Sequence, residues 1–337
     1  MKKKYKFKLW HVALAALFLA VLFLPLPVYI ESPGAAKDVA NFVRVEHKKD
    51  TRPGSFMLVY VKEAKATPLT WLVSFTDKHA VRVPAKEEVG NYNDREMERI
   101  QQYYMNASVA EAKYRALKLT NLPVKRHYIG LYVMSVLKNS HFSHKLQIGD
   151  VVTKINGKHY GNSGMYINVL KKMSPNQLVK IEFLRDKAKR SAVGRLIKLP
   201  GINRNGLGIT LTDRVKTTSN VNIATDMQGI GGPSAGLMLT LQMYSQLSHV
   251  NLLQHRKIAG TGTMETNGSI GQIGGVQQKV VAADRAGAQI FFAPDDPKIG
   301  RDNNYTQAVK TGKELHSNLK VIPARNISQV LSYLKNN

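Results

Sequence analysis

Apolar residues gather most densely at the N-terminus, where residues 9–30 are interrupted only by His11, Pro25 and Pro27. A helix needs about 20 predominantly apolar residues to cross a bilayer. Five lysines precede this run, and lysines mark the cytoplasmic side of a membrane helix. The pattern therefore predicts residues 1–30 as a cytoplasmic tail and a single transmembrane helix in the cell membrane, with the remaining chain extracytoplasmic.

The alternative is a cleaved signal peptide, for which Gly34-Ala35-Ala36 supplies small residues at a cleavage site. The apolar run is longer than the ~7–15 residues of an ordinary signal-peptide core. The sequence therefore favours the anchor, and both interpretations place the bulk of the chain outside the cytoplasm.

Residues 31–122 mix short β-like runs with turn residues and end in a helical stretch. The pattern predicts strands at 55–61 and 70–75. Asn93 and Asp94 precede a mostly polar segment, and Asp94 is the expected N-cap of a helix over 95–117. We expect a membrane-proximal β-rich segment followed by a scaffold or spacer helix.

Residues 123–200 have the pattern of a small β-rich domain with one helix. The pair Asn156-Gly157 is a strong hairpin signal. The expected helix is 165–173, and the expected strands are 128–136, 151–155, 178–184 and 196–199.

Two motifs in this domain resemble those of PDZ domains. The segment 146–157 matches the pattern L-x-x-G-D-x-I-x-x-I-N-G, and Tyr128-Ile129-Gly130-Leu131 stands where PDZ domains have an x-Φ-G-Φ loop. The resemblance implies that Ile129, Gly130 and Leu131 hold the C-terminal carboxylate of a peptide that adds as a strand to a sheet edge. The alternative is a small β fold in which Gly130 only relieves a tight turn.

From residue 201 onward the pattern alternates between strands and helices, which indicates an α/β domain over 201–337. The expected strands are 221–224, 257–260, 289–293 and 319–322, and the expected helices are 234–247, 276–287 and 327–334.

Two polar residues in this domain have surroundings that suit catalysis. Ser234 follows Gly231-Gly232-Pro233 at an expected helix start, where unpaired N–H groups and the helix dipole can stabilise an oxyanion. Lys279 borders an apolar stripe in the first turn of the next helix, and burial and the dipole both lower the pKa of such a lysine. The ordinary alternatives are a serine bonded to its local backbone and a lysine that extends its charge to solvent.

Together these residues resemble the catalytic motifs of Lon-type serine proteases. Gly232-Pro233-Ser234-Ala235-Gly236 is similar to the nucleophile motif. The lysine motif is matched by Thr261-Gly262, Gly268, 273–279, Ala282-Ala283 and Ala286-Gly287.

The resemblance implies a Ser–Lys dyad in which Ser234 attacks and Lys279 accepts the proton, while Thr261 hydrogen-bonds the lysine. Many Lon sequences have Asp where this chain has Gly231, so no role of that carboxylate carries over. The order of anchor, PDZ domain and Lon-type α/β (α+β) domain further resembles a group of membrane-anchored, ATP-independent peptidases of Gram-positive bacteria.

Two other functions remain as alternatives. The same motif reads G-x-S-x-G, the nucleophile elbow of α/β-hydrolases, and an esterase triad would use Asp295 or Asp296 with His316. Against it, the required core strands before the elbow are replaced by the anchor and the PDZ-like domain. The second alternative is a PDZ scaffold with an inactive Lon-like domain, although the serine and the lysine are both present.

The cysteine content and the charge of the chain limit the kinds of partner that it can bind. The chain has no cysteine, which excludes disulfides and thiolate chemistry. It has 49 Lys and Arg against 23 Asp and Glu, a bias that favours anionic surroundings, and residues 121–200 alone hold 15 basic and 3 acidic residues. For an extracytoplasmic chain we expect anionic lipid or a cell-wall polymer rather than nucleic acid.

No phosphate-binding loop of the form G-x-x-x-x-G-K-[ST] occurs in the sequence, so we expect no use of ATP. His141 and His144 are interpreted as loop residues, and no metal or other cofactor is expected. The predicted substrates are peptides or proteins.

Overall fold

The computed structural model describes residues 9–202, 204–227 and 229–337. A six-stranded mixed sheet forms its centre, in the order β17-β16-β13-β3-β1-β4. The strands are β1 (Val28–Asp38), β3 (Ser55–Lys65), β4 (Val81–Pro84), β13 (Lys257–Gly260), β16 (Ile290–Pro294) and β17 (Lys320–Ala324). The segments predicted as membrane-proximal (31–122) and catalytic (201–337) therefore share one sheet, joined by the parallel pair β3–β13.

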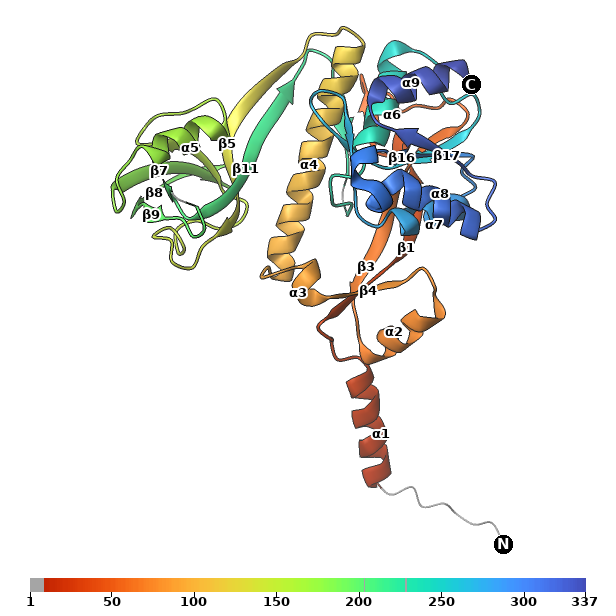
Figure 1. Cartoon of the computed structure of the whole chain (residues 1–337), viewed down its shortest axis with the longest axis horizontal. Coiled ribbons are helices and arrows are strands. Elements are labelled where there is room, and N and C mark those ends of the chain that lie inside the picture. Colours follow the sequence, from red (N-terminus) through yellow and green to blue (C-terminus); the bar gives the residue numbers. More distant parts are fainter. Residues whose placement is uncertain (1–8, 203, 228) are drawn as a thin grey trace.

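Helices cover both faces of this sheet, and alternate side chains of strand β3 point to the two faces. Phe56 and Leu58 contribute to a core with α4 (Asp94–Leu119), α6 (Gly236–Ser248) and α9 (Ile327–Asn336). Met57 and Val59 point the other way and contribute to a core with α7 (Val276–Arg285) and α8 (Asn304–Glu314). The period of two along β3 thus separates two helix layers, which Figure 1 shows around the central strands.

A second sheet stands beside the first, in the order β11-β5-β6-β7-β8. Its strands are β5 (Lys125–Val136), β6 (Val151–Ile155), β7 (Leu178–Arg185), β8 (Ala188–Arg195) and β11 (Ile209–Thr218), with helix α5 (Ser163–Lys171) packed on it. Leu131, Val152 and Tyr166 lie in its core. The long β5–β11 ribbon runs beside α4 (Figure 1), and β11 falls beyond residue 200, where we had expected this domain to end.

Short elements complete the described chain. They are α3 (Ala85–Glu88), β2 (Val43–Val45), β9 (Ile197–Lys198), β10 (Asn205–Gly206), β12 (Ile223–Thr225), β14 (Thr263–Met264), β15 (Ile270–Gly271) and the 3-10 turns η1 (Val39–Asn41) and η3 (Pro297–Asp302).

Helix α4 begins one residue earlier than the sequence predicts. Asn93, not Asp94, is the N-cap, because its side chain accepts from the Glu96 N–H at 3.0 Å while Glu96 accepts from the Asn93 N–H at 2.9 Å. This reciprocal capping box satisfies two N–H groups. The helix is also more than a spacer, since Ala112 and Ala116 are fully buried against the central sheet.

The predicted strand at 70–75 is wrong. Residues Pro68–Val73 form helix α2, followed by the 3-10 turn η2 (Ser74–Thr76). Thr67 and Thr70 cap each other's N–H groups, and Pro68 occupies the first helical turn, where its fixed φ is already helical. Local capping therefore overrides the β preference of the apolar residues that follow.

At the N-terminus, helix α1 spans Leu9–Leu22. This helix is shorter than the predicted one, which extended to residue 30, because Val28 already pairs with Pro84 in the central sheet. Among the residues that the structure describes, none of the helices has both the length and the apolar character needed to span a bilayer. The lysines at positions 2–8 lie outside the described residues.

Candidate active site

Ser234 lies in a tight turn that the glycines before it make possible. Gly232 has φ +85°, a left-handed conformation that favours glycine, and its N–H donates to the Gln101 carbonyl of α4 at 3.1 Å. Helix α6 begins at Gly236, so Ser234 precedes the helix by two residues instead of starting it. The N-terminus of α6 still faces this turn.

Lys279 lies in the first turn of α7. The N-cap of that helix is Gly275, which has φ +65°. A Cβ on Gly275 would lie 2.5 Å from the Val61 side chain. Glycine thus allows the helix start to lie directly against β3. This packing buries Lys279, which is 4% exposed.

The fold brings the two residues together. The Lys279 Nζ donates to the Ser234 Oγ at 3.1 Å. Burial lowers the pKa of Lys279 to about 8, and the nearby Glu31 carboxylate partly opposes this by stabilising the ammonium. The lowered pKa increases the fraction of neutral amine, which is the form that can accept a proton from a hydroxyl.

Thr261 has a different contact from the one that the family resemblance implies. Its hydroxyl donates to the main-chain carbonyl of Ser234 at 3.2 Å, and the next N–H, of Gly262, donates to the same carbonyl at 2.9 Å. Thr261 is fully buried. It therefore fixes the backbone of Ser234 instead of bonding Lys279.

Gly231 stands where many Lon sequences have Asp, and the structure gives a reason for the difference. A Cβ at this position would lie 2.9 Å from the Gln101 Cβ. Helix α4 thus occupies the space that a side chain at 231 would need. Nothing in the local sequence of α4 indicates that Gln101 contacts the serine turn.

Ser234 and Lys279 line a pocket of about 400 Å³. One wall comes from β1 and β3, with Glu31, Tyr60 and Glu63, and the opposite wall comes from 272–275. Glu31 and Glu63 are directly paired across β1 and β3. Burial and neighbouring carboxylates raise the pKa of both glutamates. Neither was singled out from the sequence.

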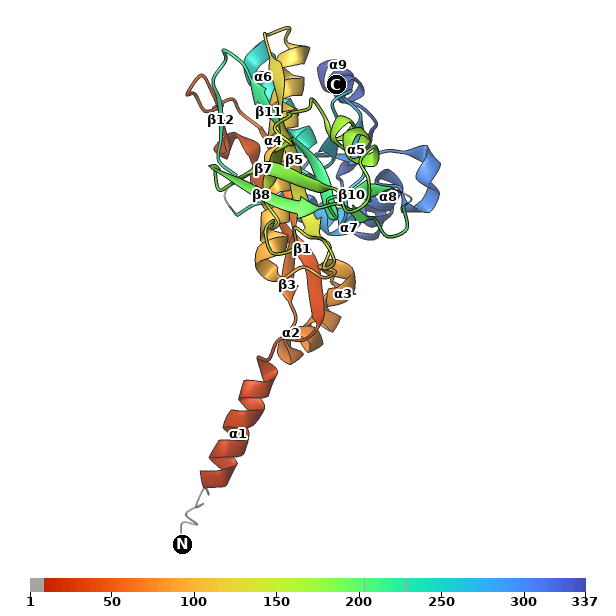
Figure 2. The same ribbon diagram turned by 90° about the vertical axis from the view of Figure 1, so that its left-hand side faces the viewer.

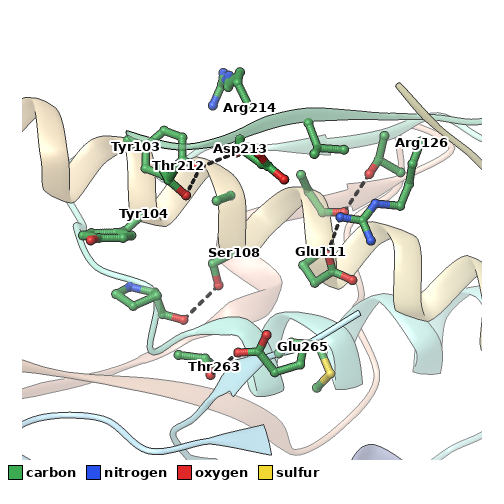
Figure 3. Close-up of a pocket in the computed structure, with 16 residues that line it drawn as sticks. Tyr103, Tyr104, Ser108, Glu111, Arg126, Thr212, Asp213, Arg214, Thr263 and Glu265 are labelled. Atoms are coloured by element: carbon green, nitrogen blue, oxygen red, sulfur yellow. Dashed lines mark hydrogen bonds and ion pairs between the residues drawn. The ribbon is translucent and has the colours of Figure 1, made fainter. Parts of the chain in front are cut away.

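A second pocket, of about 470 Å³, is lined by Pro233 and by residues of α4 and β11 (Figure 3). The Ser108 Oγ of α4 donates to the Pro233 carbonyl there, at 3.0 Å. Further along the pocket, Arg126 forms an ion pair with Glu111 at 3.3 Å. Helix α4 therefore hydrogen-bonds the turn 231–234 at two positions, through Ser108 and through the Gln101 carbonyl.

The structure does not place the expected carboxylate loop at a sheet edge. Ile129, Gly130 and Leu131 lie inside β5, which is paired on both sides, with β11 and β6. A Cβ on Gly130 would lie 2.3 Å from the Val152 carbonyl oxygen. Gly130 therefore permits close approach of β6, and Leu131 is paired on both sides, with Asp213 and Val152.

β11 and β8 are the two edge strands of this sheet. In the described part of the chain β11 pairs only with β5. Gly208, with φ +71°, leads into it between the buried Leu207 and the half-buried Ile209. The sequence Leu207-Gly208-Ile209 could have indicated the start of this edge strand. We missed it because we had assigned these residues to the next domain.

The residues of the alternative esterase triad lie elsewhere. His316 borders a pocket with Asp284 and Gln289 that does not include Ser234. Asp295 accepts from Arg325 at 2.7 Å and from Asn303 at 2.7 Å. The base within reach of Ser234 is thus the lysine.

Comparisons with known proteins identify similar proteins and a matching family model. The chain is similar to the Lon protease of Aster yellows witches'-broom phytoplasma, 25% identical over 174 residues that cover 52% of this chain and 21% of that protein. It is similar to the Lon protease of Fusobacterium nucleatum, 33% identical over 99 residues that cover 29% and 12%. The matches thus span about a fifth or less of these curated relatives.

Among solved structures, the PDZ domain of the SdrC-like protein from Listeria monocytogenes is 29% identical, covering 25% of this chain and 90% of that one, with a TM-score of 0.25. Residues 132–336, well over half of the chain, match the family model of the Lon protease (S16) C-terminal proteolytic domain. The chain therefore belongs to the family of the Lon protease C-terminal proteolytic domain.

Proposed function

We propose that this chain is a membrane-attached serine endopeptidase that works without ATP and cleaves extracytoplasmic peptides or small membrane and secreted proteins. Family membership supports a serine peptidase. The observation that carries the finer proposal is the 3.1 Å contact between Ser234 Oγ and a lysine that is 4% exposed.

In the first step, the neutral Lys279 amine takes the proton of the Ser234 hydroxyl while Oγ attacks the peptide carbonyl. The carbonyl π electrons move to oxygen, and the positive end of the α6 dipole, beside Ser234, can stabilise that oxyanion. Collapse expels the amine, which receives the proton from Lys279. An acyl-enzyme remains, and water attacks it by the same route with Lys279 again as the base.

Thr261 and Ser108 support this chemistry without taking part in proton transfer. Both hydroxyls donate to main-chain carbonyls of the serine turn, at Ser234 and Pro233. A fixed backbone holds Oγ in one position relative to the lysine, which lowers the entropic cost of the attack.

The acidic wall of the pocket gives an expectation for the substrate. Glu31 and Glu63 both line it, and a basic residue of the substrate near the scissile bond would form ion pairs there. We therefore propose that peptides with Lys or Arg close to the cleavage site are preferred over acidic ones.

We further propose that the second sheet captures substrate peptides. The outer edge of β11 can accept an extended peptide as an added strand. Gly208, with φ +71°, makes the turn that leads into this strand. This recognition function belongs to the PDZ-like domain that the sequence predicts, with its binding edge moved from 129–131 to the strand after Gly208.

The proposed location is the outer face of a cell membrane, with α1 inserted and the chain after it extracytoplasmic. The anchor is preferred over a cleaved signal because Gly34-Ala35-Ala36 lies within β1, where Ala36 pairs with Val59 of β3. Anionic lipid or a wall polymer would surround the basic residues of 121–200.

The test compares peptides released by cells that carry the native chain with those from cells that carry Ser234→Ala. The expected difference is a set of fragments present only with the native chain, and Lys279→Arg should lose the same set because a guanidinium stays protonated. Ser317→Ala, which changes a serine bonded to Asp284 away from the site, is the matched control. A folded Lys279→Arg protein that releases the full set would contradict the dyad.

A further inference from the structure

A cluster of large apolar side chains is exposed at the end of the molecule where α1 joins the sheet. Leu69, Trp71, Leu72, Val73 and Phe75 are 37–57% exposed, and all five lie within seven residues of α2 and η2. Single exposed apolar residues are ordinary, but a contiguous group marks an interaction surface. We refer to these five side chains as the α2 surface.

This surface is held firmly in its exposed position. The Ser74 hydroxyl donates to the Trp71 carbonyl at 2.6 Å, and Arg82 of β4 donates to the Ser74 carbonyl at 3.0 Å. The Arg82 guanidinium also covers one face of the Phe75 ring at 4.1 Å. The Trp71 and Phe75 rings meet edge to face at 4.9 Å. The apolar side chains are therefore displayed by a defined structure.

The apolar character of the neighbouring helix α1 indicates that lipid covers the α2 surface. Figures 1 and 2 both show α2 beside the C-terminal end of α1, and the two helices are in contact. Helix α1 has no charged residue, and Trp10, Leu14 and Leu17 are more than half exposed. A helix that is apolar all round is suited to lipid and not to one face of a protein.

The composition of the α2 surface fits the boundary of a bilayer. Aromatic rings such as Trp71 and Phe75 prefer the interfacial layer, where apolar and polar surroundings meet. The exposed Lys65 and Lys78 flank the surface and would meet the phosphates of anionic lipids.

We propose that the α2 surface lies in the interfacial layer of the membrane and fixes the catalytic pocket just above it. The proposal rests on the proposed membrane attachment through α1. Helix α1 ends at Leu22, β1 begins at Val28, and Glu31 of β1 lines the pocket. Three residues, about 10 Å of strand, therefore separate the start of β1 from the pocket. The substrates of such a pocket are chain segments that emerge from the bilayer or lie on its surface.

The two tryptophans of the chain, Trp10 and Trp71, allow a direct test. The full chain carrying Ser234→Ala is reconstituted in vesicles of phosphatidylcholine and phosphatidylglycerol. Part of the phosphatidylcholine carries bromine either near the headgroup or near the chain ends. Trp10→Phe leaves Trp71 as the reporter of the α2 surface, and Trp71→Phe leaves Trp10 as the reporter of α1.

We expect Trp71 fluorescence to be quenched severalfold more by shallow than by deep bromine, with emission shifted to shorter wavelength. Unquenched Trp71 beside a quenched Trp10 would overturn the proposal and leave the anchor intact. If neither tryptophan is quenched, both the attachment and the α2 surface proposal are wrong. Trp71 emission shifted to shorter wavelength without quenching would also overturn it, since a protein partner then covers the surface.

A functional measurement complements the spectroscopy. Leu72→Ser and Val73→Ser, in the otherwise native chain, should lower cleavage of a vesicle-bound peptide severalfold relative to a freely dissolved peptide of the same sequence. Val193→Ser changes an exposed valine of β8, in the other sheet, and should leave the ratio unchanged. An unchanged ratio for the Leu72 and Val73 variants would refute the proposed height of the pocket.

Discussion

The charge balance between Glu31 and Lys279 leads to a quantitative prediction for Glu31→Gln. Burial lowers the pKa of Lys279 to about 8, while the Glu31 carboxylate raises it. At pH 7, an amine with this pKa is neutral in roughly one molecule in ten, against about one in 3,000 at the ordinary value of 10.5. Removing the carboxylate lowers the pKa further, so more enzyme has its base ready at neutral pH.

These fractions set the size of the effect. Because roughly a tenth of the native protein is already competent at pH 7, Glu31→Gln can raise kcat/KM there by at most about tenfold. Above pH ~9, where Lys279 is neutral in both proteins, the two rates should meet. The native profile should rise with pH through about 8 and move to lower pH in the variant.

The assay is kcat/KM between pH 6 and 10, on a short peptide without acidic or basic side chains, so that loss of the acidic wall does not change binding. Glu63→Gln is the matched control, because Glu63 lines the same pocket while the pKa of Lys279 responds to Glu31. A Glu31→Gln profile that coincides with the native one, or moves to higher pH, would refute the assignment of Lys279 as the base.

Three further predictions follow from single contacts. Lys279→Met should have a free energy of unfolding about 3 kcal/mol above that of the native chain at pH 7, measured in urea, because the folded state disfavours the Lys279 ammonium. This difference should disappear as the pH rises from about 8 to 10.5. An equal difference at all pH values would contradict the prediction. Ser108→Ala should lower kcat severalfold with little change in KM, because it removes the hydrogen bond to the Pro233 carbonyl, which contributes about 1 kcal/mol. An unchanged kcat would show that this hydrogen bond does not position the turn that holds Ser234. Gly130→Ala should destabilise the fold by about 1–3 kcal/mol in thermal unfolding, because its Cβ meets the Val152 carbonyl, and an unaltered Tm together with weaker peptide binding would restore the original loop assignment.

Residues that act through local chemistry were predictable from the sequence. The serine motif and the lysine 45 positions later indicated the pair that the structure brings within 3.1 Å. The lowered pKa of Lys279 comes from burial, which the apolar stripe beside it indicated in the sequence. Their support was not visible, because Gln101 and Ser108 lie on a polar helix far away along the chain and act only through contacts made on folding.

The errors have physical causes of the same kind. Residues 70–75 look β-branched and aromatic, yet the Thr67–Thr70 cap selects a helix. Gly130 matched a binding motif by its neighbours, but β11 pairs alongside β5 and removes the edge that the motif requires. Strand pairing between distant segments is not encoded in local periodicity, so the shared central sheet could not be predicted either.

That shared sheet also determines which parts of the chain can be moved independently. Residues 201–337 contain the serine and the lysine, but β3, which pairs with β13, and Glu31 of the pocket wall come from before residue 66. A fragment starting at 201 would expose the edge of β13 and lack one wall of its own active site. The catalytic unit is therefore discontinuous, and we expect residues 201–337 alone, grafted onto another protein or separated from β3, to be inactive.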